Sequence, residues 1–123
     1  PPAILGQRAD VPQLLRLVDI LCLPTFREGL PNVCLEASST SVPIVATRVT
    51  GTVDCVEDGV NGLLVEPHSP DALAYGLTRV LTDKNLAQSL KQNSRAWVSE
   101  RFEEKLVVDL HIEFLESLAA RSA

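Results

Sequence analysis

The chain has 123 residues, of which 46% are hydrophobic and 4% aromatic, and its net charge at neutral pH is −5. This length and apolar content suit one globular domain with an aliphatic core and exclude a disordered chain. The negative charge argues against nucleic acid as a partner, and no apolar run is long enough for a transmembrane segment. The odd set of cysteines (Cys22, Cys34 and Cys55) is typical of reduced core thiols in a cytoplasmic protein.

The first elements alternate between strand and helix. Residues 4–6 indicate the end of a strand and residues 7–10 a loop. Asp10 is expected to cap a short helix that Pro12 helps to begin. The apolar face of this helix consists of Leu14, Leu15 and Val18. The unbroken apolar run at 20–23 then predicts a strand covered on both faces, as in a parallel sheet.

A loop and a second helix follow this strand. Pro24 ends the strand because proline cannot donate to a ladder, and Pro31 suits the first turn of a helix. Gly29, just before that helix, lets the backbone approach a ligand closely. The free N–H groups of a first helical turn bind anions, whereas the carboxylates of Glu28 and Glu36 accept hydrogen bonds from sugar hydroxyls. This stretch therefore suits a sugar attached to a nucleotide.

A further strand is predicted at 44–46, and another glycine follows its C-terminal end. The second helix should end near residue 40, because the residue before Pro43 avoids the helical region. In open parallel sheets, ligands bind outside the carboxyl ends of the strands. Gly51 and the start of a short helix near Val53 are therefore expected to face the same ligand as Gly29.

The last strand is predicted at 63–65. Gly59 is expected to cap the short helix before it, and residues 61–62 to form a tight turn. His68 and His111 lie far apart in the sequence, and no Asp-x-Asp motif is present. No metal site is therefore expected.

From residue 69 onward the sequence predicts helices. Ser69 caps the first of them, with the apolar stripe Leu73, Leu77, Val80 and Leu81. Asp83 caps the next one, which carries Leu86, Leu90, Ala96 and Trp97. The chain is expected to break near Phe102 and to restart as a last helix with the stripe Leu106, Val107, Leu110, Phe114 and Leu118.

The wording around the two glutamates resembles a known signature. Glu28 and Glu36 have seven residues between them, with Pro-Thr ahead, Glu-Gly-Leu-Pro at the first and Leu-Glu-Ala at the second. This resembles the Glu-x7-Glu signature of retaining glycosyltransferases of the GT-B fold, glycosyltransferase family 4. Two downstream segments also resemble this family, Val-Pro-Ile-Val-Ala-Thr and Glu-Asp-Gly-Val-Asn-Gly-Leu-Leu-Val. The resemblance covers almost the whole chain and implies an α/β fold, a Rossmann-like parallel sheet with helices on both faces followed by C-terminal helices.

The resemblance also implies an activity and a site. The activity is transfer of a sugar, of hexosyltransferase type, from a nucleotide sugar to an acceptor hydroxyl with retention of configuration. Glu28 would act on the transferred sugar as the catalytic residue, and Glu36 would bind the ribose. The donor-binding set is Gly29, Leu30, Pro31, Asn32, Glu36 and Gly51. The early loop lies near the base in this family, so Arg8 or Asp10 either reads the base or is a surface residue. No cofactor or metal is expected.

Family members have two lobes, and the N-terminal lobe holds most of the acceptor site. Residues 1–123 are therefore expected to form a single partial domain, the nucleotide-sugar-binding lobe without its first strands, inactive by itself. The acceptor is expected to be a glycan, a lipid or a small molecule, bound through the N-terminal lobe. The protein is expected in the cytoplasm, and the N-terminal lobe would provide any peripheral attachment to the inner membrane face. A non-catalytic module that binds a nucleotide or a protein is the alternative. A sugar-nucleotide epimerase or a sugar phosphorylase would share the fold but not the Glu-Gly-Leu-Pro wording.

Three positions depart from the family pattern. The family usually has glycine where Ser41 stands, and a left-handed cap at serine costs on the order of 1 kcal/mol relative to glycine. It more often has glycine and glutamate where Thr50 and Asp54 stand. These two departures alter the shape expected of the sugar pocket.

Overall fold

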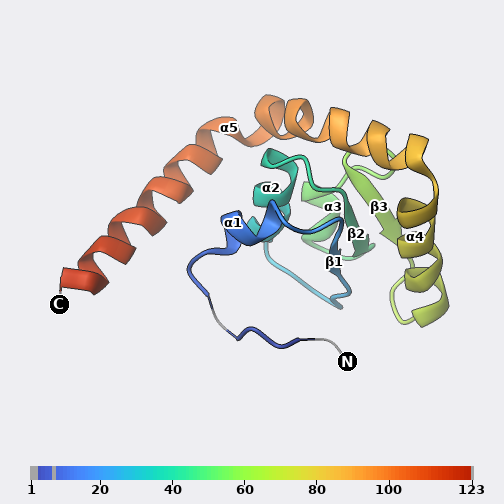
Figure 1. The fold of residues 1–123 in the computed structure, drawn as a ribbon, viewed down its shortest axis with the longest axis horizontal. Coiled ribbons are helices and arrows are strands. Elements are labelled where there is room, and N and C mark those ends of the chain that lie inside the picture. Colours follow the sequence, from blue (N-terminus) through green and yellow to red (C-terminus); the bar gives the residue numbers. More distant parts are fainter. Residues whose placement is uncertain (1–2, 7, 123) are drawn as a thin grey trace.

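The computed structural model describes residues 3–6 and 8–122, with the side chains of 103–112, 114 and 122 left out of the description. Strands and helices alternate along the chain (Figure 1). The elements are α1 (Val11–Leu15), β1 (Leu21–Leu23), α2 (Asn32–Ser39), β2 (Ile44–Thr47), α3 (Thr52–Cys55), β3 (Gly62–Val65), α4 (Pro70–Thr82) and α5 (Lys84–Ser122). This order is that of successive βαβ units.

The strands form one parallel sheet in the order β1-β2-β3. Central β2 is buried at every position, whereas β1 is only half-buried, so the prediction of a strand covered on both faces holds for β2 and not for β1. The sheet with its flanking helices confirms the predicted Rossmann-like α/β fold. The strand expected at residues 4–6 is absent, and Ile4 is 94% exposed. Without a neighbouring strand to pair with, these residues form no ladder.

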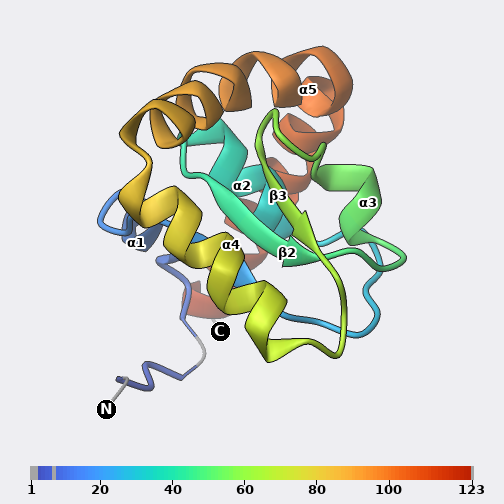
Figure 2. The same cartoon turned by 90° about the vertical axis from the view of Figure 1, so that its right-hand side faces the viewer.

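Helices cover both faces of the sheet (Figure 2). Side chains alternate across a strand, so Ile44 and Ala46 pack in one cluster with Leu35 of α2 and Trp97 of α5. Val45 points to the opposite face and packs in a second cluster, the other buried members of which are Leu63, Val80 and Leu90. α5 thus contributes to both cores, because Leu90 and Trp97 lie on opposite sides of the sheet.

Two helix caps predicted from the sequence are confirmed. The Ser69 hydroxyl accepts a hydrogen bond from the Ala72 N–H at 3.1 Å, with Pro70 as the first residue of α4. The Asp83 carboxylate accepts one from the Leu86 N–H at 3.0 Å. The starts of α4 and α5 are therefore determined by local sequence.

The apolar stripe of α4 is narrower than predicted. Val80 is buried and both Leu73 and Leu77 are partly buried, whereas Leu81 is 62% exposed. Neighbouring residues on an α-helix point about 100° apart. When Val80 faces the sheet, Leu81 therefore turns toward solvent.

Helix α5 differs from its prediction in two respects. Leu90 and Trp97 are buried as expected, but Ala96 is exposed, and Ser94 and Val98 are buried in its place. The inward face follows the helical spacing from Leu90, and Ala96 lies outside it. The break expected near residue 102 is also wrong, because α5 is one helix.

The continuity of α5 has a simple cause. The sequence contains no glycine or proline after Gly76, so no residue interrupts the hydrogen-bond ladder. Figure 1 shows α5 crossing above the sheet and then turning toward the C-terminus. Leu118 is 42% exposed. The other side chains of the predicted last stripe (Leu106, Val107, Leu110 and Phe114) lie outside the described residues, as does His111.

Helix α1 begins at Val11 with Pro12 in its first turn, as predicted, but without the expected side-chain cap. Asp10 occupies the cap position, yet its carboxylate binds the Arg8 guanidinium at 2.6 and 2.7 Å instead of a helix N–H. The helix ends at Leu15, which is buried, and Val18 beyond it is 44% exposed. A charged partner nearby therefore competes with capping.

Ser41 adopts the left-handed conformation expected from its place after α2, with φ at +61°. We expect Ser41→Gly to raise the free energy of unfolding by about 1 kcal/mol, because glycine has no Cβ to oppose this conformation. Chemical denaturation of both proteins measures the difference. An unchanged or lower stability would contradict the expectation.

Candidate functional site

Two loops meet at the carboxyl ends of β1 and β2. The Glu28 N–H donates a hydrogen bond to the Thr50 carbonyl at 3.1 Å. The Thr47 hydroxyl donates another to the Thr25 carbonyl. The β1–α2 loop (24–31) is therefore attached at two points to the end of β2 and the β2–α3 loop (48–51).

Gly51 lies at the centre of this contact. Its φ is +97°, and a Cβ there would be 2.2 Å from the Gly29 carbonyl oxygen and 2.4 Å from that of Glu28. Only glycine fits so close to another backbone segment. The structure thus brings together Glu28, Gly29 and Gly51, which the sequence analysis assigned to one site.

Helix α2 begins directly after the β1–α2 loop. Pro31 occupies the cap position and no side chain caps the helix, so the prediction that Pro31 lies in its first turn is off by one residue. Asn32, the first residue of α2, is exposed, Leu30 is half-buried and Pro31 is buried. An uncapped first turn presents backbone N–H groups to an anion.

Thr52 holds the β2–α3 loop in place, a role that the sequence analysis missed. Its fully buried hydroxyl accepts a hydrogen bond from the Val49 N–H at 3.1 Å and donates to the Val49 and Thr47 carbonyls. Threonine within a turn favours such local bonds, and that is the signal that would have identified it. The loop beside Gly51 is therefore rigidly built.

The two glutamates differ in their surroundings. Glu28 is half-buried in the β1–α2 loop. Glu36 is half-buried on α2, so it is not a fully solvated surface acid. Burial raises the pKa of Glu36, and the nearby charge of Glu113 on α5 adds to this effect. A carboxylate that is costly to keep charged gains from hydroxyl donors, which a bound sugar would supply.

The raised pKa of Glu36 predicts a pH-dependent stability. Between its ordinary value of 4.5 and the higher folded value, the folded state binds more protons than the unfolded state. Stability therefore falls as pH rises through this window. We expect Glu36→Gln to raise the melting temperature at about pH 7 and to leave it unchanged at about pH 4. Melts at both pH values test this, and equal effects at both would contradict it.

The two residues proposed to read the base contact each other. Arg8 and Asp10 form an ion pair at 2.6 Å and are both exposed. The Arg8 guanidinium lowers the pKa of Asp10.

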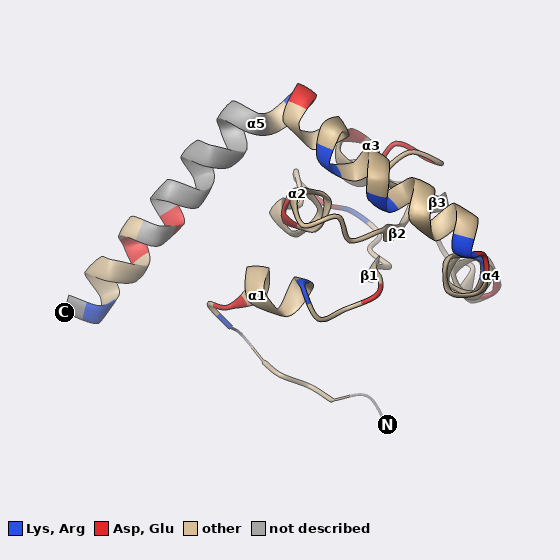
Figure 3. Ribbon diagram, turned by 45° about the horizontal axis from the view of Figure 1, so that its top comes forward, with Lys and Arg blue, Asp and Glu red and all other residues tan. Residues whose placement is uncertain are grey.

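Charge is distributed over several elements. Figure 3 shows Lys and Arg along the first half of α5 and singly elsewhere among the described residues. The net charge of the chain is −5, which disfavours the approach of an anionic phosphate. At the α2 N-terminus, neutral backbone amides are therefore more favourable partners for a phosphate than the charged surface of the chain as a whole. Among the described residues, no group of three or more His, Cys, Asp and Glu is placed to hold a metal ion.

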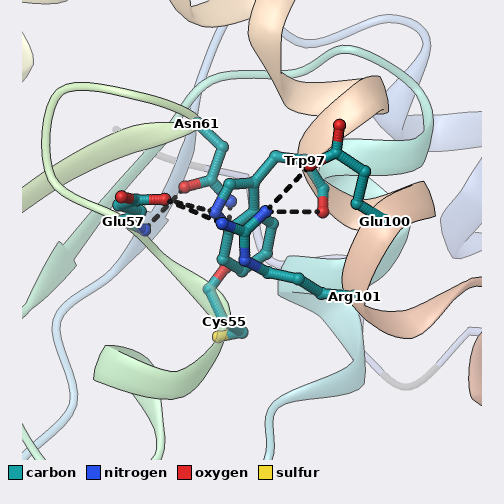
Figure 4. A network of polar contacts seen from close by, with 6 residues as sticks. All are labelled: Cys55, Glu57, Asn61, Trp97, Glu100 and Arg101. Atoms are coloured by element: carbon teal, nitrogen blue, oxygen red, sulfur yellow. Dashed lines mark hydrogen bonds and ion pairs between the residues drawn. The ribbon is translucent and has the colours of Figure 1, made fainter.

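A second polar cluster joins α5 to the segment before β3 (Figure 4). The Trp97 indole N–H donates to the Glu57 carboxylate at 2.6 Å. The Arg101 guanidinium lies 4.9 Å from the Trp97 ring centre and 3.6 Å from the same carboxylate. A surface pocket beside this cluster is lined by Arg48, Val53, Asp54, Val56, Glu57, Asp58, Leu64, Trp97 and Arg101. None of the predicted catalytic or donor-binding residues lines it, but Val53 and Asp54, which were expected to face or shape the sugar pocket, do.

Asn61 connects this cluster to α2. Its amide oxygen accepts from the Glu57 N–H at 2.7 Å, and its amide nitrogen donates to the Cys55 carbonyl at 2.9 Å and the Ser38 hydroxyl at 3.1 Å. Helix α3 ends at Cys55, so Gly59, with φ at +83°, lies in the following turn and does not cap it as predicted. The tight turn expected at 61–62 lies slightly earlier, at 59–61, because Gly62 already begins β3, and Asn61 in this turn is fully buried.

The cysteines are free, as predicted. Cys34 and Cys55 are buried and Cys22 is half-buried. A hydrogen bond with Cys55, together with burial, raises the pKa of the Cys34 thiol. The Cys34 thiol therefore remains a protonated core group. No helix in the described part of the chain is both long and apolar enough to cross a bilayer.

A parallel sheet with two glycine-containing loops joined at its carboxyl edge defines a Rossmann-like ligand-binding lobe. A sequence profile of the family described as Glycosyl transferases group 1 matches residues 3–97. The chain belongs to this family.

Two relatives illustrate the match. The chain is 40% identical over 86 residues to a D-inositol 3-phosphate glycosyltransferase of Salinispora arenicola, an alignment of 70% of this chain and 19% of that protein. It is 32% identical over 90 residues to the capsular polysaccharide biosynthesis glycosyltransferase CapM of Staphylococcus aureus, covering 73% of this chain and 24% of that one. The chain therefore spans about a fifth to a quarter of the length of these relatives.

Solved structures agree with the fold. HepE of Anabaena in complex with UDP-glucose has a TM-score of 0.76 and 32% identity, over 94% of this chain and 31% of that one. The C-terminal domain of LpcC, a group 1 glycosyl transferase family protein of Francisella tularensis, has a TM-score of 0.71 and 26% identity, over 82% of this chain and 52% of that one.

Proposed function

We propose that the chain is the donor-binding part of a retaining glycosyltransferase of family 4, which transfers a hexose from a nucleotide sugar to an acceptor hydroxyl. The observation that carries the proposal is the close contact of Gly51 with the backbone of Glu28 and Gly29, directly before the uncapped start of α2. This contact joins the two glycine loops at the sheet edge where ligands bind. The likeness to HepE, the structure of which contains UDP-glucose, supports a uridine nucleotide as the donor.

The roles follow from the chemistry of each group. The N–H groups of Gly29, Leu30 and Asn32 would stabilise the developing charge of the leaving diphosphate. Pro31 has no N–H and would contribute by starting the helix. The Glu28 carboxylate would accept from hydroxyls of the transferred sugar.

Two further contacts would complete the donor site. Glu36 would accept from the ribose hydroxyls. Gly51 would hold the Glu28 loop in position through its backbone contact. The reaction would need no metal.

The acceptor site belongs to a second lobe in this proposal. The chain spans about a fifth to a quarter of two relatives, so most of the acceptor site would lie outside the 123 residues. The enzyme would work in the cytoplasm, and the second lobe would provide any attachment to the inner membrane face. The 123-residue chain by itself would transfer no sugar. Turnover by the purified chain would contradict this part of the proposal.

Thermal melts with UDP, GDP, ADP and their sugars test donor binding. A ligand about tenfold above its Kd adds about 1.4 kcal/mol, which raises the melting temperature by several degrees. We expect one nucleotide to do this, and to do it less in Glu36→Ala. Asp71→Ala, which removes an exposed acid on α4, is the control and should keep the full shift. A cooperative melt that no nucleotide shifts would favour the non-catalytic module.

A further inference from the structure

Two aromatic rings lie stacked at the same edge of the sheet as the proposed donor site. Phe26 comes from the β1–α2 loop and His68 from the β3–α4 loop, and both loops follow the carboxyl ends of parallel strands. The ring centres are 4.6 Å apart and the planes differ by 13°. Phe26 is 68% exposed and His68 is exposed. The pair is therefore not part of either core.

Hydrogen bonds fix the backbone on both sides of Phe26, and the backbone of His68 is strained. On one side of Phe26, the Arg27 N–H donates to the Thr25 hydroxyl at 3.3 Å, and on the other the Glu28 N–H is bonded to Thr50. His68 has φ at +61°, a conformation that residues other than glycine seldom adopt. An exposed apolar ring adds little to the free energy of unfolding, and a strained backbone lowers it. These features therefore indicate a ligand-binding role for the two rings.

We propose that Phe26 is a binding platform for the ring of an acceptor sugar and that His68 is its positioning residue. This inference rests on the proposed function. Parallel stacking leaves the outer face of each ring open, and an aromatic face carries partial negative charge that attracts the C–H groups of a sugar ring. Contact with His68 fixes the orientation of Phe26 before any ligand arrives.

The order of residues along the loop favours the acceptor over the donor. Phe26 precedes Glu28 by two residues, whereas the start of α2 at Asn32 follows it. If Glu28 holds the transferred sugar and the α2 amides hold the diphosphate, Phe26 stands, along the loop, on the side of Glu28 away from the residues that hold the nucleotide. An acceptor approaching the transferred sugar from that side meets the aromatic platform.

The test is a titration of the 123-residue chain with the methyl α-glycosides of glucose, galactose and mannose, followed by proton NMR. At least one glycoside should shift the ring signals of Phe26 and His68, and its own C–H protons should move upfield. Phe26→Leu, which keeps an apolar side chain, should weaken this affinity about tenfold, and Phe26→Tyr should retain it. Tyr75→Leu is the matched control, because Tyr75 is also 68% exposed but lies on α4.

His68→Asn tests the positioning role, since asparagine tolerates positive φ but has no ring. It should move the Phe26 ring signals without sugar and weaken binding several-fold. Unchanged sugar affinity in Phe26→Leu, or ring signals that no glycoside shifts, would overturn the proposal. The glycoside titration needs no nucleotide, so it is read separately from a titration with UDP. If UDP shifts the Asn32 signal but no glycoside shifts the ring signals, only the proposed platform is overturned. If a glycoside shifts the ring signals but UDP does not shift the Asn32 signal, only the donor site is overturned.

Discussion

Gly51→Ala is expected to lower the free energy of unfolding by about 3 kcal/mol and to abolish nucleotide binding. The new methyl group would lie 2.2 Å from the Gly29 carbonyl oxygen and would also force alanine into φ near +97°. Backbone strain and overpacking each cost about 1–3 kcal/mol. The β1–α2 loop must move to make room, and this movement displaces Glu28. Chemical denaturation measures the loss of stability, and a thermal melt with UDP measures the loss of binding.

Gly59→Ala is the matched control. Gly59 also has a positive φ, of +83°, but nothing lies within 4 Å of the added methyl group. It should cost about 1 kcal/mol and leave nucleotide binding unchanged. Equal losses in the two variants would mean that the contact between the glycine loops contributes nothing beyond backbone conformation.

Asn61→Ala is expected to lower the free energy of unfolding by about 3 kcal/mol. The amide of Asn61 is fully buried and bonds to the Glu57 N–H, the Cys55 carbonyl and the Ser38 hydroxyl. Alanine leaves these partners unsatisfied in the core, at about 1–3 kcal/mol each, and relaxation recovers part of the cost. Chemical denaturation again measures the change.

Asn93→Ala controls for the loss of an amide. Asn93 is exposed on α5, and its amide lies 3.4 Å from the Ser89 hydroxyl. Its replacement should change stability by about 0.5 kcal/mol or less. A loss in Asn61→Ala no larger than that in Asn93→Ala would show that the buried junction does not hold α2 and the segment before β3 together.

Features that depend on neighbouring residues were predictable from the sequence. The caps at Ser69 and Asp83 and the strand at 44–46 were predicted from local patterns, and all three are present, the strand as β2 (Ile44–Thr47). The left-handed conformation of Ser41 was expected from the resemblance, because the family usually has glycine at this position. The break expected in α5 near Phe102 was wrong, and the sequence there contains no glycine or proline that would cause one.

Features that depend on contacts between distant segments were not predictable. Asp10 was expected to cap α1, but its carboxylate pairs with Arg8. Asn61 suited a turn by its residue type, yet its amide lies buried against Ser38, 23 positions away. The stacking of Phe26 on His68 likewise joins two loops that local patterns describe separately.

The candidate site was likewise predictable only in part from the sequence. The Glu-Gly-Leu-Pro sequence and the glycine after β2 indicated two loops that the structure brings into contact. The structure adds how they are joined, through Thr47, Thr50 and Thr52, and that geometry depends on the register of the sheet. The roles assigned to Glu28 and Glu36 stay predictions.

The most direct test of the donor site is an amide NMR titration of the chain with UDP. The account predicts that the N–H signals of Gly29, Leu30, Asn32 and Gly51 shift together with one Kd. The Trp97 indole N–H, bonded to Glu57 outside the site, should stay unchanged. Shifts confined to the pocket beside Trp97, or no shift at the start of α2, would contradict the account.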